Sequence, residues 1–252
     1  MTPYLAEARA WQESWDRQQE TYLPDREHRF AALLDAADAV SGDGPLRLLD
    51  LAGGTGSISL RALARRPDAQ VTVVDLDPVL LTIAEASLSG RAAIVTADLN
   101  RPDWTAALPH RGYDAVLTAT ALHWLDGPRL ASLYREIHDT LRPGGVFANA
   151  DHMPSDALPT LTTRLTERAR QRRAARHAAG AAQSWAGWWE QAAADPTLGP
   201  LVEKRRQIYP TGHSPEWTPP ASWHLDALRA AGFSEVGVLW RNGGDAAVAA
   251  VA

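Results

Sequence analysis

Residues 46–56 of this chain read Leu46-Arg47-Leu48-Leu49-Asp50-Leu51-Ala52-Gly53-Gly54-Thr55-Gly56. A short apolar run that ends in a single acid is typical of a buried parallel strand. The glycines that follow carry no Cβ, so the backbone can turn sharply and approach a ligand closely. Apolar side chains at Leu60, Leu63 and Ala64 predict that a helix comes next. Strand, glycine turn and helix together predict a ligand-binding cradle at the carboxyl edge of a sheet.

The rest of the chain alternates apolar runs with helical segments. Four more buried strands are predicted at residues 71–75, 92–96, 113–118 and 146–150. This alternation predicts an α/β fold with a doubly wound, mostly parallel sheet. Two closing strands, 235–240 and 246–251, are joined by Asn242-Gly243-Gly244-Asp245, which is a hairpin signal. The last of the seven strands is therefore expected to be antiparallel.

One domain is expected to span residues 1–252, because this length fits a single large domain with an inserted cap. N-terminal helices are predicted within residues 1–40 and the ligand-binding core within 46–150. A helical cap, helical from 155 to about 195, is predicted within 151–220. A closing helix and the last strands fill 221–252.

Composition excludes several classes of protein. The chain has no cysteine, so disulfides, zinc–thiolate sites and thiol nucleophiles are excluded. Its net charge of −5 gives no general field that attracts nucleic acid. The first residues lack the pattern of a signal peptide, and no apolar run approaches the ~18 residues that a membrane span needs. We therefore expect a cytoplasmic protein without a nucleic-acid or membrane partner.

Acids end three successive predicted strands: Asp50, Asp75 and Asp98. Asp75 lies about 20 residues beyond Gly54, the offset at which a carboxylate can accept both hydroxyls of a ribose. Asp98 is placed to receive the exocyclic amine of an adenine, and Trp104 to cover its ring. Each acid alone could equally cap a helix or close a turn. Together they favour one adenosine ligand, and the absence of a third glycine after Gly56 argues against a pyrophosphate.

This pattern resembles the class I S-adenosylmethionine-dependent methyltransferases over roughly residues 20–150 and the last 30. The family's acid-x-Gly-x-Gly-x-Gly turn corresponds to Asp50, Ala52, Gly54 and Gly56, with alanine in place of the first glycine. The resemblance implies S-adenosyl-L-methionine as the cofactor. It implies these core contacts to the cofactor: Asp50, Ala52, Gly53, Gly54, Gly56, Asp75, Leu76, Asp98, Leu99, Thr118, Ala119 and His123.

The resemblance extends to an N-terminal lid. Residues Tyr22 to Arg26 are similar to a lid segment of small-molecule members of the family, which implies that Tyr22 or Arg26 meets the methionine carboxylate. Arg26, in the first turn of a helix, could equally be solvated surface. The arrangement is also similar to the trans-aconitate methyltransferase-like group, although its substrate cannot be carried over.

Three residues at the predicted active edge are candidates for catalysis. Methyl transfer needs an aligned acceptor, exclusion of water and, for a protonated nucleophile, a base. The candidates for that base are His123, Asp151 and His152. Alternatively, His123 packs the lip of the pocket, and Asp151 and His152 form a hinge to the cap. The histidines are scattered along the chain, so no metal site is expected.

The predicted cap carries two patterned stretches. Arg164, Arg168, Arg172 and Arg176 are spaced by four, which suits either an anion-binding stripe or a solvated face. Tryptophans at 185, 188 and 189 suit either packing of the cap on the core or a cage for an apolar or aromatic substrate.

Two functions are compatible with these patterns. We expect methyl transfer to an O, N or C nucleophile of a small-molecule acceptor that is partly apolar or aromatic, by a monomer or homodimer. The alternative is a protein of the same fold that binds S-adenosylmethionine without transferring its methyl group.

Overall fold

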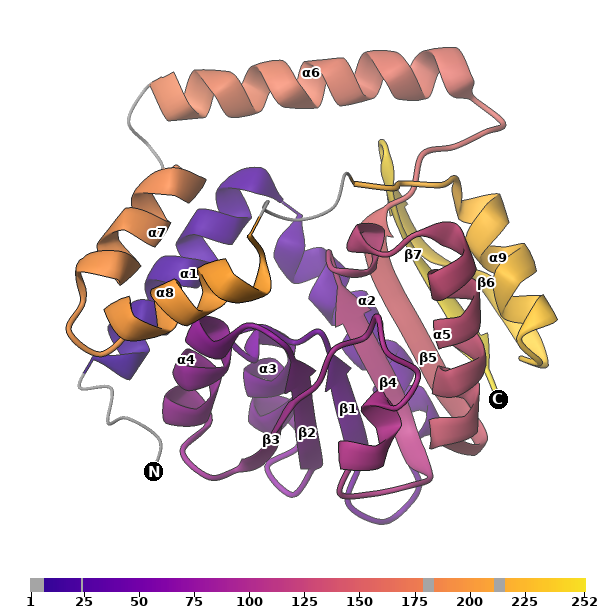
Figure 1. The fold of residues 1–252 in the computed structure, drawn as a ribbon. Helices are drawn as coiled ribbons and strands as arrows, with labels where there is room; N and C mark the ends of the chain where they lie inside the picture. Colours follow the sequence, from indigo (N-terminus) through magenta and orange to yellow (C-terminus); the bar gives the residue numbers. More distant parts are fainter. Residues whose placement is uncertain (1–6, 24, 179–183, 211–215) are drawn as a thin grey trace.

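A computed structural model describes residues 7–23, 25–178, 184–210 and 216–252. Its centre is a seven-stranded sheet with the order β3-β2-β1-β4-β5-β7-β6 (Figure 1). The strands are β1 (Arg47–Leu51), β2 (Gln70–Asp75), β3 (Ala92–Thr96), β4 (Tyr113–Ala119), β5 (Leu141–His152), β6 (Glu235–Asn242) and β7 (Asp245–Val251). Pairs among β1 to β5 are parallel, whereas β7 is antiparallel to both β5 and β6. The predicted fold class is therefore confirmed.

Helices surround this sheet and extend beyond its carboxyl edge. They are α1 (Ala8–Tyr22), α2 (Arg26–Val40), α3 (Ser57–Arg65), α4 (Pro78–Leu88), α5 (Gly127–Thr140), α6 (Pro159–Ala178), α7 (Trp185–Ala194), α8 (Gly199–Ile208) and α9 (Ala221–Ala230). Short 3₁₀ turns lie at Trp104–Ala107 and Leu122–Trp124. Figure 1 shows α1, α7 and α8 together on the side toward which β1 to β4 point, with α6 running above them.

Two boundaries differ from the predictions. The fifth strand, expected over 146–150, begins at Leu141, because Tyr113 of β4 already pairs with Leu141 before a bulge shifts the register. The predicted helical stretch of the cap ends at α7, but a further helix, α8, follows over Gly199–Ile208. Pro200 in the first turn of α8 is compatible with a helix start, because the missing N–H has no partner there.

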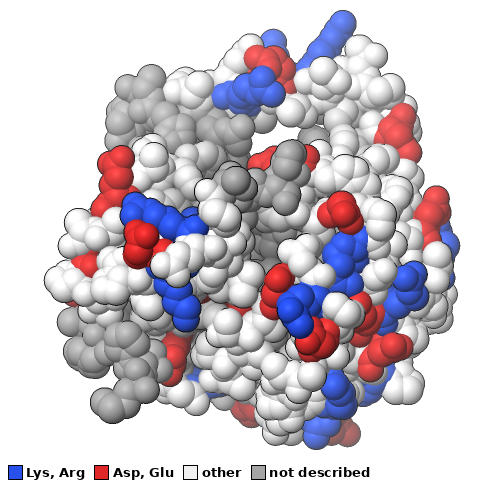
Figure 2. Space-filling model, viewed as in Figure 1, with Lys and Arg blue, Asp and Glu red and all other residues white. Residues whose placement is uncertain are grey.

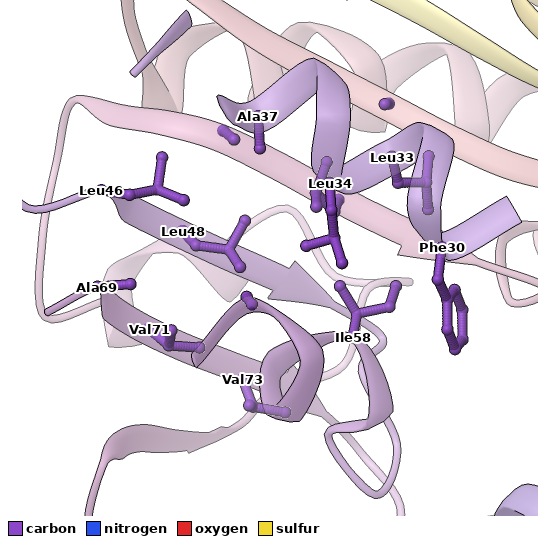
Figure 3. Packing of buried hydrophobic residues seen from close by; sticks show 14 of the residues in the cluster. Phe30, Leu33, Leu34, Ala37, Leu46, Leu48, Ile58, Ala69, Val71 and Val73 are labelled. Carbon is purple, nitrogen blue, oxygen red and sulfur yellow. The ribbon is translucent and has the colours of Figure 1, made fainter. Parts of the chain in front are cut away.

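Hydrophobic clusters cover both faces of the sheet, because successive side chains of a strand point to opposite sides. Leu48 of β1 joins a cluster under α2, α3 and α4, whereas Leu49 and Leu51 join one under α5 and α9. Figure 3 shows Leu33 and Leu34 of α2 within the first of these clusters, beside Leu48 of β1. Burial on both faces fixes the strand ends, and with them the edge that carries the site.

A third cluster joins the cap to the body. Trp188 of α7 is fully buried and meets Trp11 and Trp15 of α1 edge-on, with ring centroids 5.5 Å and 4.9 Å apart. Val79 and Ile83 of α4 belong to the same cluster. For Trp188, packing of the cap on the body is therefore the correct interpretation.

Helix α6 is largely exposed. Arg164, Arg168 and Arg172 all lie on the surface, and Figure 2 shows basic side chains along this helix at the top of the view. The side chain of Arg176 lies outside the described part of the chain. The arginine spacing therefore marks a solvated face in the part that is described. Across the described ranges, no helix is long and apolar enough to cross a membrane.

Candidate functional site

A cavity of about 500 Å³ lies at the carboxyl edge of the sheet. The glycine turn and the segments after β2, β3 and β4 form its floor, while α1, α2, α7 and α8 contribute walls. The lining comprises Trp15, Gln19, Arg26, Phe30, Asp50, Ala52, Gly53, Gly54, Ser57, Ile58, Asp75, Leu76, Asp77, Leu80, Ala97, Asp98, Leu99, Asn100, Ala119, Thr120, Ala121, Leu122, Trp124, Leu125, Trp185, Trp189, Arg205, Ile208, Tyr209 and Pro210. The predicted cradle and the predicted cap thus enclose one space.

The glycine turn is built from alternating left-handed residues. Ala52, Gly54 and Gly56 have φ values of 51°, 55° and 75°. A Cβ on Gly53 would lie 2.7 Å from Cγ of Asp50, so a larger residue here would force neighbouring atoms to shift. Gly56 precedes α3 and packs toward Leu88, and it is not part of the cavity wall. Of the glycines predicted to meet the cofactor, Gly53 and Gly54 are therefore the two that line the cavity.

Asp50 lies beneath this turn and is fully buried. Its Oδ2 accepts hydrogen bonds from the N–H and the hydroxyl of Ser59, at 3.0 and 2.6 Å. Its Oδ1 has no partner among the described residues. Burial raises the pKa of Asp50 to about 6, against the lowering effect of the Ser59 hydrogen bonds. A cationic group of a ligand at the turn would complete the contacts of this carboxylate.

Asp75 ends β2 and is held by backbone N–H groups. It accepts hydrogen bonds from Gly54 at 2.8 Å, Leu76 at 2.7 Å and Asp77 at 2.9 Å. Burial raises its pKa to about 6, and the nearby Asp77 carboxylate adds to this increase. These bonds orient the carboxylate, which borders the cavity together with Leu76.

Asp98 and Leu99, two of the predicted cofactor contacts, follow β3 and line the cavity. Asp98 accepts a hydrogen bond from the N–H of Asn100 at 2.9 Å, which leaves most of its acceptor capacity free. Trp104 was expected to cover an adenine ring. Instead it is buried and donates to Glu136 at 2.6 Å, outside the cavity wall. That expectation is wrong, and Trp124 and Leu125 are the side chains that line the cavity in its place.

The N-terminal helices contribute Arg26 but not Tyr22 to the cavity wall. Arg26 is buried, pairs with Asp16 at 2.7 Å and lies over the Phe30 ring at 4.5 Å. Arg26 is therefore not solvated surface.

The Tyr22 hydroxyl instead accepts a hydrogen bond from the N–H of Trp185 at 3.0 Å, which ties α1 to the cap. Pro24, within the same predicted lid segment, lies outside the described residues.

Helix α1 is tied to the glycine turn by contacts that sequence reasoning missed. Gln12 donates to the hydroxyls of Thr55 and Ser57, at 3.0 and 3.1 Å. Ser57 donates to Asp16 at 2.7 Å. Because Asp16 also holds Arg26, this network fixes the position of Arg26 relative to the turn. The sequence predicted helices within residues 1–40, but no local signal indicated these polar partners.

Two histidine–aspartate pairs lie at the ends of β4 and β5. Nδ1 of His123 is 2.7 Å from Asp151, and Nδ1 of His152 is 2.6 Å from Asp245, with the two rings 5.8 Å apart. Asp245 also pairs with Arg29, which is buried. Asp245 was missed by sequence reasoning, because it was interpreted only as part of a hairpin turn.

These pairs shift the pKa values of their members. Burial alone would raise the pKa of Asp151, but the hydrogen bond with His123 and the histidine charges hold it below its usual value. The hydrogen bond with Asp245 raises the pKa of His152. Four of the predicted site residues lie outside the cavity wall: Thr118, His123, Asp151 and His152. Their neighbours Ala119, Leu122 and Trp124 do belong to it. Thr120 of that wall donates its N–H to Ala150 of β5, so the pairs adjoin the cavity.

Within the described ranges, no group of three or more His, Asp or Glu side chains is arranged to hold a metal ion.

Known proteins resemble this chain in sequence and in fold. A family model described as a methyltransferase domain matches residues 48–145. The trans-aconitate 2-methyltransferase of Methylobacterium radiotolerans is 31% identical over 217 residues, which cover 86% of this chain and 72% of that protein. A ubiquinone/menaquinone biosynthesis C-methyltransferase of Methylobacterium nodulans is 36% identical over 110 residues, which cover 41% of this chain and only 40% of that protein. Among solved structures, the S-adenosylmethionine-dependent methyltransferase SibL has a TM-score of 0.55 at 19% identity, with 89% of this chain and 55% of that chain covered.

This chain belongs to the class I S-adenosylmethionine-dependent methyltransferases. The predicted family and its cofactor, S-adenosylmethionine, are thereby confirmed. The cavity fits this cofactor on three observations. Gly53 lets the turn lie directly against Asp50 at the cavity wall, Asp50 carries a buried oxygen without a described partner, and Asp75 is oriented at the end of β2.

Proposed function

We propose that this chain transfers a methyl group from S-adenosylmethionine to an oxygen, nitrogen or carbon nucleophile of a small molecule. The observation that carries this proposal is the cavity in which the glycine turn and three strand-end acids face an aromatic cap. Its volume of about 500 Å³ lies in the range of small-molecule sites. When bound, S-adenosylmethionine supplies a methyl group on a sulfonium, which a nucleophile can displace in line.

The residues of the cavity define a direction for the cofactor. Asp75 would accept the ribose hydroxyls, because backbone N–H groups orient its carboxylate. Asp98 and Leu99 would border the adenine. Asp50 would meet the methionine ammonium from below the turn, and Arg26 would meet its carboxylate. The methyl group would then face the walls made by α1, α2 and α7.

Those walls favour an uncharged aromatic acceptor. They present the rings of Trp15, Phe30, Trp185 and Trp189. Trp185 is 40% exposed, unlike the fully buried Trp188, so it is free to contact a ligand. Flat rings of this kind bind an aromatic acceptor by stacking and by burying its apolar surface.

Charge in the described lining also argues against a polycarboxylate acceptor. Its two arginines, Arg26 and Arg205, are both paired with acids, at 2.7 and 2.5 Å. The same lining carries Asp50, Asp75 and Asp98. With Arg26 assigned to the cofactor and Arg205 paired with Asp77, the described lining offers a carboxylate-rich acceptor no further guanidinium group. On this ground the acceptor differs from the compound for which the trans-aconitate 2-methyltransferase relative is named.

We take His152 as the general base for a hydroxyl or amine acceptor; like His123, it lies beside the cavity wall and not in it. Asp245 holds its Nδ1, which leaves Nε2 to take a proton. Its side chain is 35% exposed, against 7% for His123, so it is the more accessible of the two. Asp151 accepts a hydrogen bond from the backbone N–H of His152 at 2.8 Å and is bonded to the ring Nδ1 of His123, so it positions the His123 ring, whereas Asp245 positions that of His152.

The proposal is tested by incubating the purified protein with methyl-labelled S-adenosylmethionine and a panel of acceptors. The panel contains phenols, aromatic amines, aromatic carbon nucleophiles and trans-aconitate, and mass spectrometry follows methylated product and S-adenosylhomocysteine. We expect product with an uncharged aromatic compound and little with trans-aconitate. Efficient methylation of trans-aconitate would overturn the acceptor class but not methyl transfer. Tight cofactor binding without product across the panel would instead support a non-methylating protein of the same fold.

A further inference from the structure

Helix α8 of the cap reaches the same cavity as the strand-end acids. Arg205 and Ile208 at its end, with Tyr209 and Pro210 immediately after it, line the cavity together with Asp75 and Asp98. Figure 1 shows α8 beside α4, above the carboxyl ends of β2 and β3. The cap is therefore a wall of the proposed adenosine site as well as of the acceptor site.

Arg205 connects α8 to the segment that follows Asp75. Its Nε lies 2.5 Å from Oδ2 of Asp77, and the two side chains are only 16% and 5% exposed. An ion pair shielded from water to this degree is stronger than an exposed one.

Two aromatic rings hold the same guanidinium group. Arg205 lies 4.0 Å from the ring centroid of Trp189 on α7 and 5.1 Å from that of Tyr209. A planar guanidinium can stack on rings while it donates hydrogen bonds in its own plane, which an ammonium group cannot do equally well. Arg205 thus joins α7, the end of α8 and the loop after β2 at one point.

Charge explains why an arginine suits this point. Asp77 lies two residues beyond Asp75, and its carboxylate disfavours ionisation of Asp75. Burial raises the pKa of Asp77, and the charge and hydrogen bond of Arg205 oppose this increase, so they support the ionised carboxylate. The cation therefore offsets the concentration of negative charge beside the proposed ribose site.

We propose that α8 is a clamp on the adenosine part of the cofactor, with Arg205 as the positioning residue that holds the clamp against Asp77. This inference rests on the proposed placement of the cofactor in the cavity. The clamp retains bound cofactor, so that loss of Arg205 accelerates cofactor release. Helix α8 is then part of the cofactor site, although it lies far along the chain from the glycine turn.

Arg205→Ala is compared with Arg206→Ala in the intact chain, with S-adenosylhomocysteine as the probe. Arg206 is the adjacent residue, is 64% exposed and pairs only within α8, with Glu203 at 2.9 Å, in the contacts described. We expect Arg205→Ala to weaken binding about tenfold in calorimetry and to raise the dissociation rate in stopped-flow measurements. Arg206→Ala should bind like the wild type. Arg205→Lys, which keeps the charge but not the planar stacking group, should fall between them.

Thermal unfolding distinguishes a clamp from a purely structural contact. A clamp mutation reduces the stabilisation that S-adenosylhomocysteine adds, whereas a structural defect lowers the melting temperature of the free protein without reducing that increment. Asp77 itself is not the residue to change, because its Oδ1 also caps α4 through Val79 and Leu80. An unchanged dissociation rate and ligand-induced increment in Arg205→Ala would overturn the clamp.

Cofactor placement is checked independently with Asp75→Ala. If Asp75→Ala weakens binding while Arg205→Ala does not, only the clamp is wrong. If Asp75→Ala has no effect, the cofactor does not lie where we propose, and the clamp inference is overturned with it.

Discussion

Asp75 accepts a hydrogen bond of 2.8 Å from the backbone N–H of Gly54, which joins the end of β2 to the glycine turn after β1. The carboxylate that we expect to bind the ribose is therefore fixed by the turn that we expect to bind the methionine end. Asp75→Asn should weaken binding of S-adenosylhomocysteine by ~1.5–3 kcal/mol, because a charged hydrogen-bond acceptor is lost. Calorimetry at pH 7.5 measures this change.

Asp103→Asn is the matched control for that substitution. Asp103 is 62% exposed and pairs with Arg101 near the surface, outside the cavity wall. The affinity of Asp103→Asn for S-adenosylhomocysteine should equal that of the wild type. Equal affinities for Asp75→Asn and the wild type would remove Asp75 from the site.

Cofactor affinity should depend on pH through the same carboxylate. Burial raises the pKa of Asp75 to about 6, and the Asp77 carboxylate contributes to the shift. Only the ionised form accepts two hydroxyls, so affinity should increase as the pH rises through about 6 and level off above it. Binding at pH 5 should be about tenfold weaker than at pH 7.5. Calorimetry over this range checks the profile.

Asp50, with a similar pKa of about 6, can steepen the pH dependence of cofactor affinity, so Asp75→Asn should flatten the profile only in part. An unchanged profile in Asp75→Asn would contradict the assignment.

The departure from the family's glycine pattern at Ala52 should carry a measurable strain. Ala52 has a φ of 51°, a left-handed conformation that costs an L-residue roughly 1–2 kcal/mol. Ala52→Gly relieves this strain but makes the unfolded chain more flexible, so the net gain in unfolding free energy should be at most about 1 kcal/mol. Denaturant unfolding of the free protein measures this difference.

Gly53→Ala is the reverse substitution at the adjacent position. Its Cβ would lie 2.7 Å from Cγ of Asp50 and 2.9 Å from Cγ1 of Val73, so crowding should lower the unfolding free energy by about 1–3 kcal/mol. The two variants should therefore differ in sign. A destabilised Ala52→Gly protein would show that the alanine methyl group packs better than its backbone angle suggests.

Local patterns predicted most of the fold and the floor of the site. Apolar runs, glycine turns and the acids at residues 50, 75 and 98 lie within single strand–turn units, where spacing alone fixes their neighbours. The walls could not be predicted in this way. Arg205 meets Asp77 across 128 residues, and His152 meets Asp245 across 93. Trp104 was misassigned for the same reason, because its partner Glu136 belongs to a distant helix. Contacts of this kind depend on how helices pack, which no local spacing encodes.

The pairing of His152 with Asp245 predicts a shift in the pH dependence of turnover. Once an acceptor hydroxyl or amine has been found, His152→Gln should lower kcat by about 10²-fold, because a general base typically contributes that much. His110→Gln is the control, since His110 is exposed and lies outside the cavity wall. A base acts in its neutral form, and the hydrogen bond with Asp245 raises the pKa of His152 above 6.5. Wild-type kcat should therefore rise with pH and reach its half-maximum above 6.5.

Asp245→Asn removes the group that raises this pKa, so the half-maximum of kcat should move to lower pH while its plateau falls, because the ring is less well oriented. Rate measurements from pH 5 to 9 at saturating cofactor check both effects. A purely structural role for the pair would leave the half-maximum in place, whereas a loss of stability is expected in either case because the buried Arg29 also loses its partner. Full turnover in His152→Gln would mean that His152 is not the base. Either His123 then takes the proton, or alignment of the acceptor with the methyl group accounts for the rate.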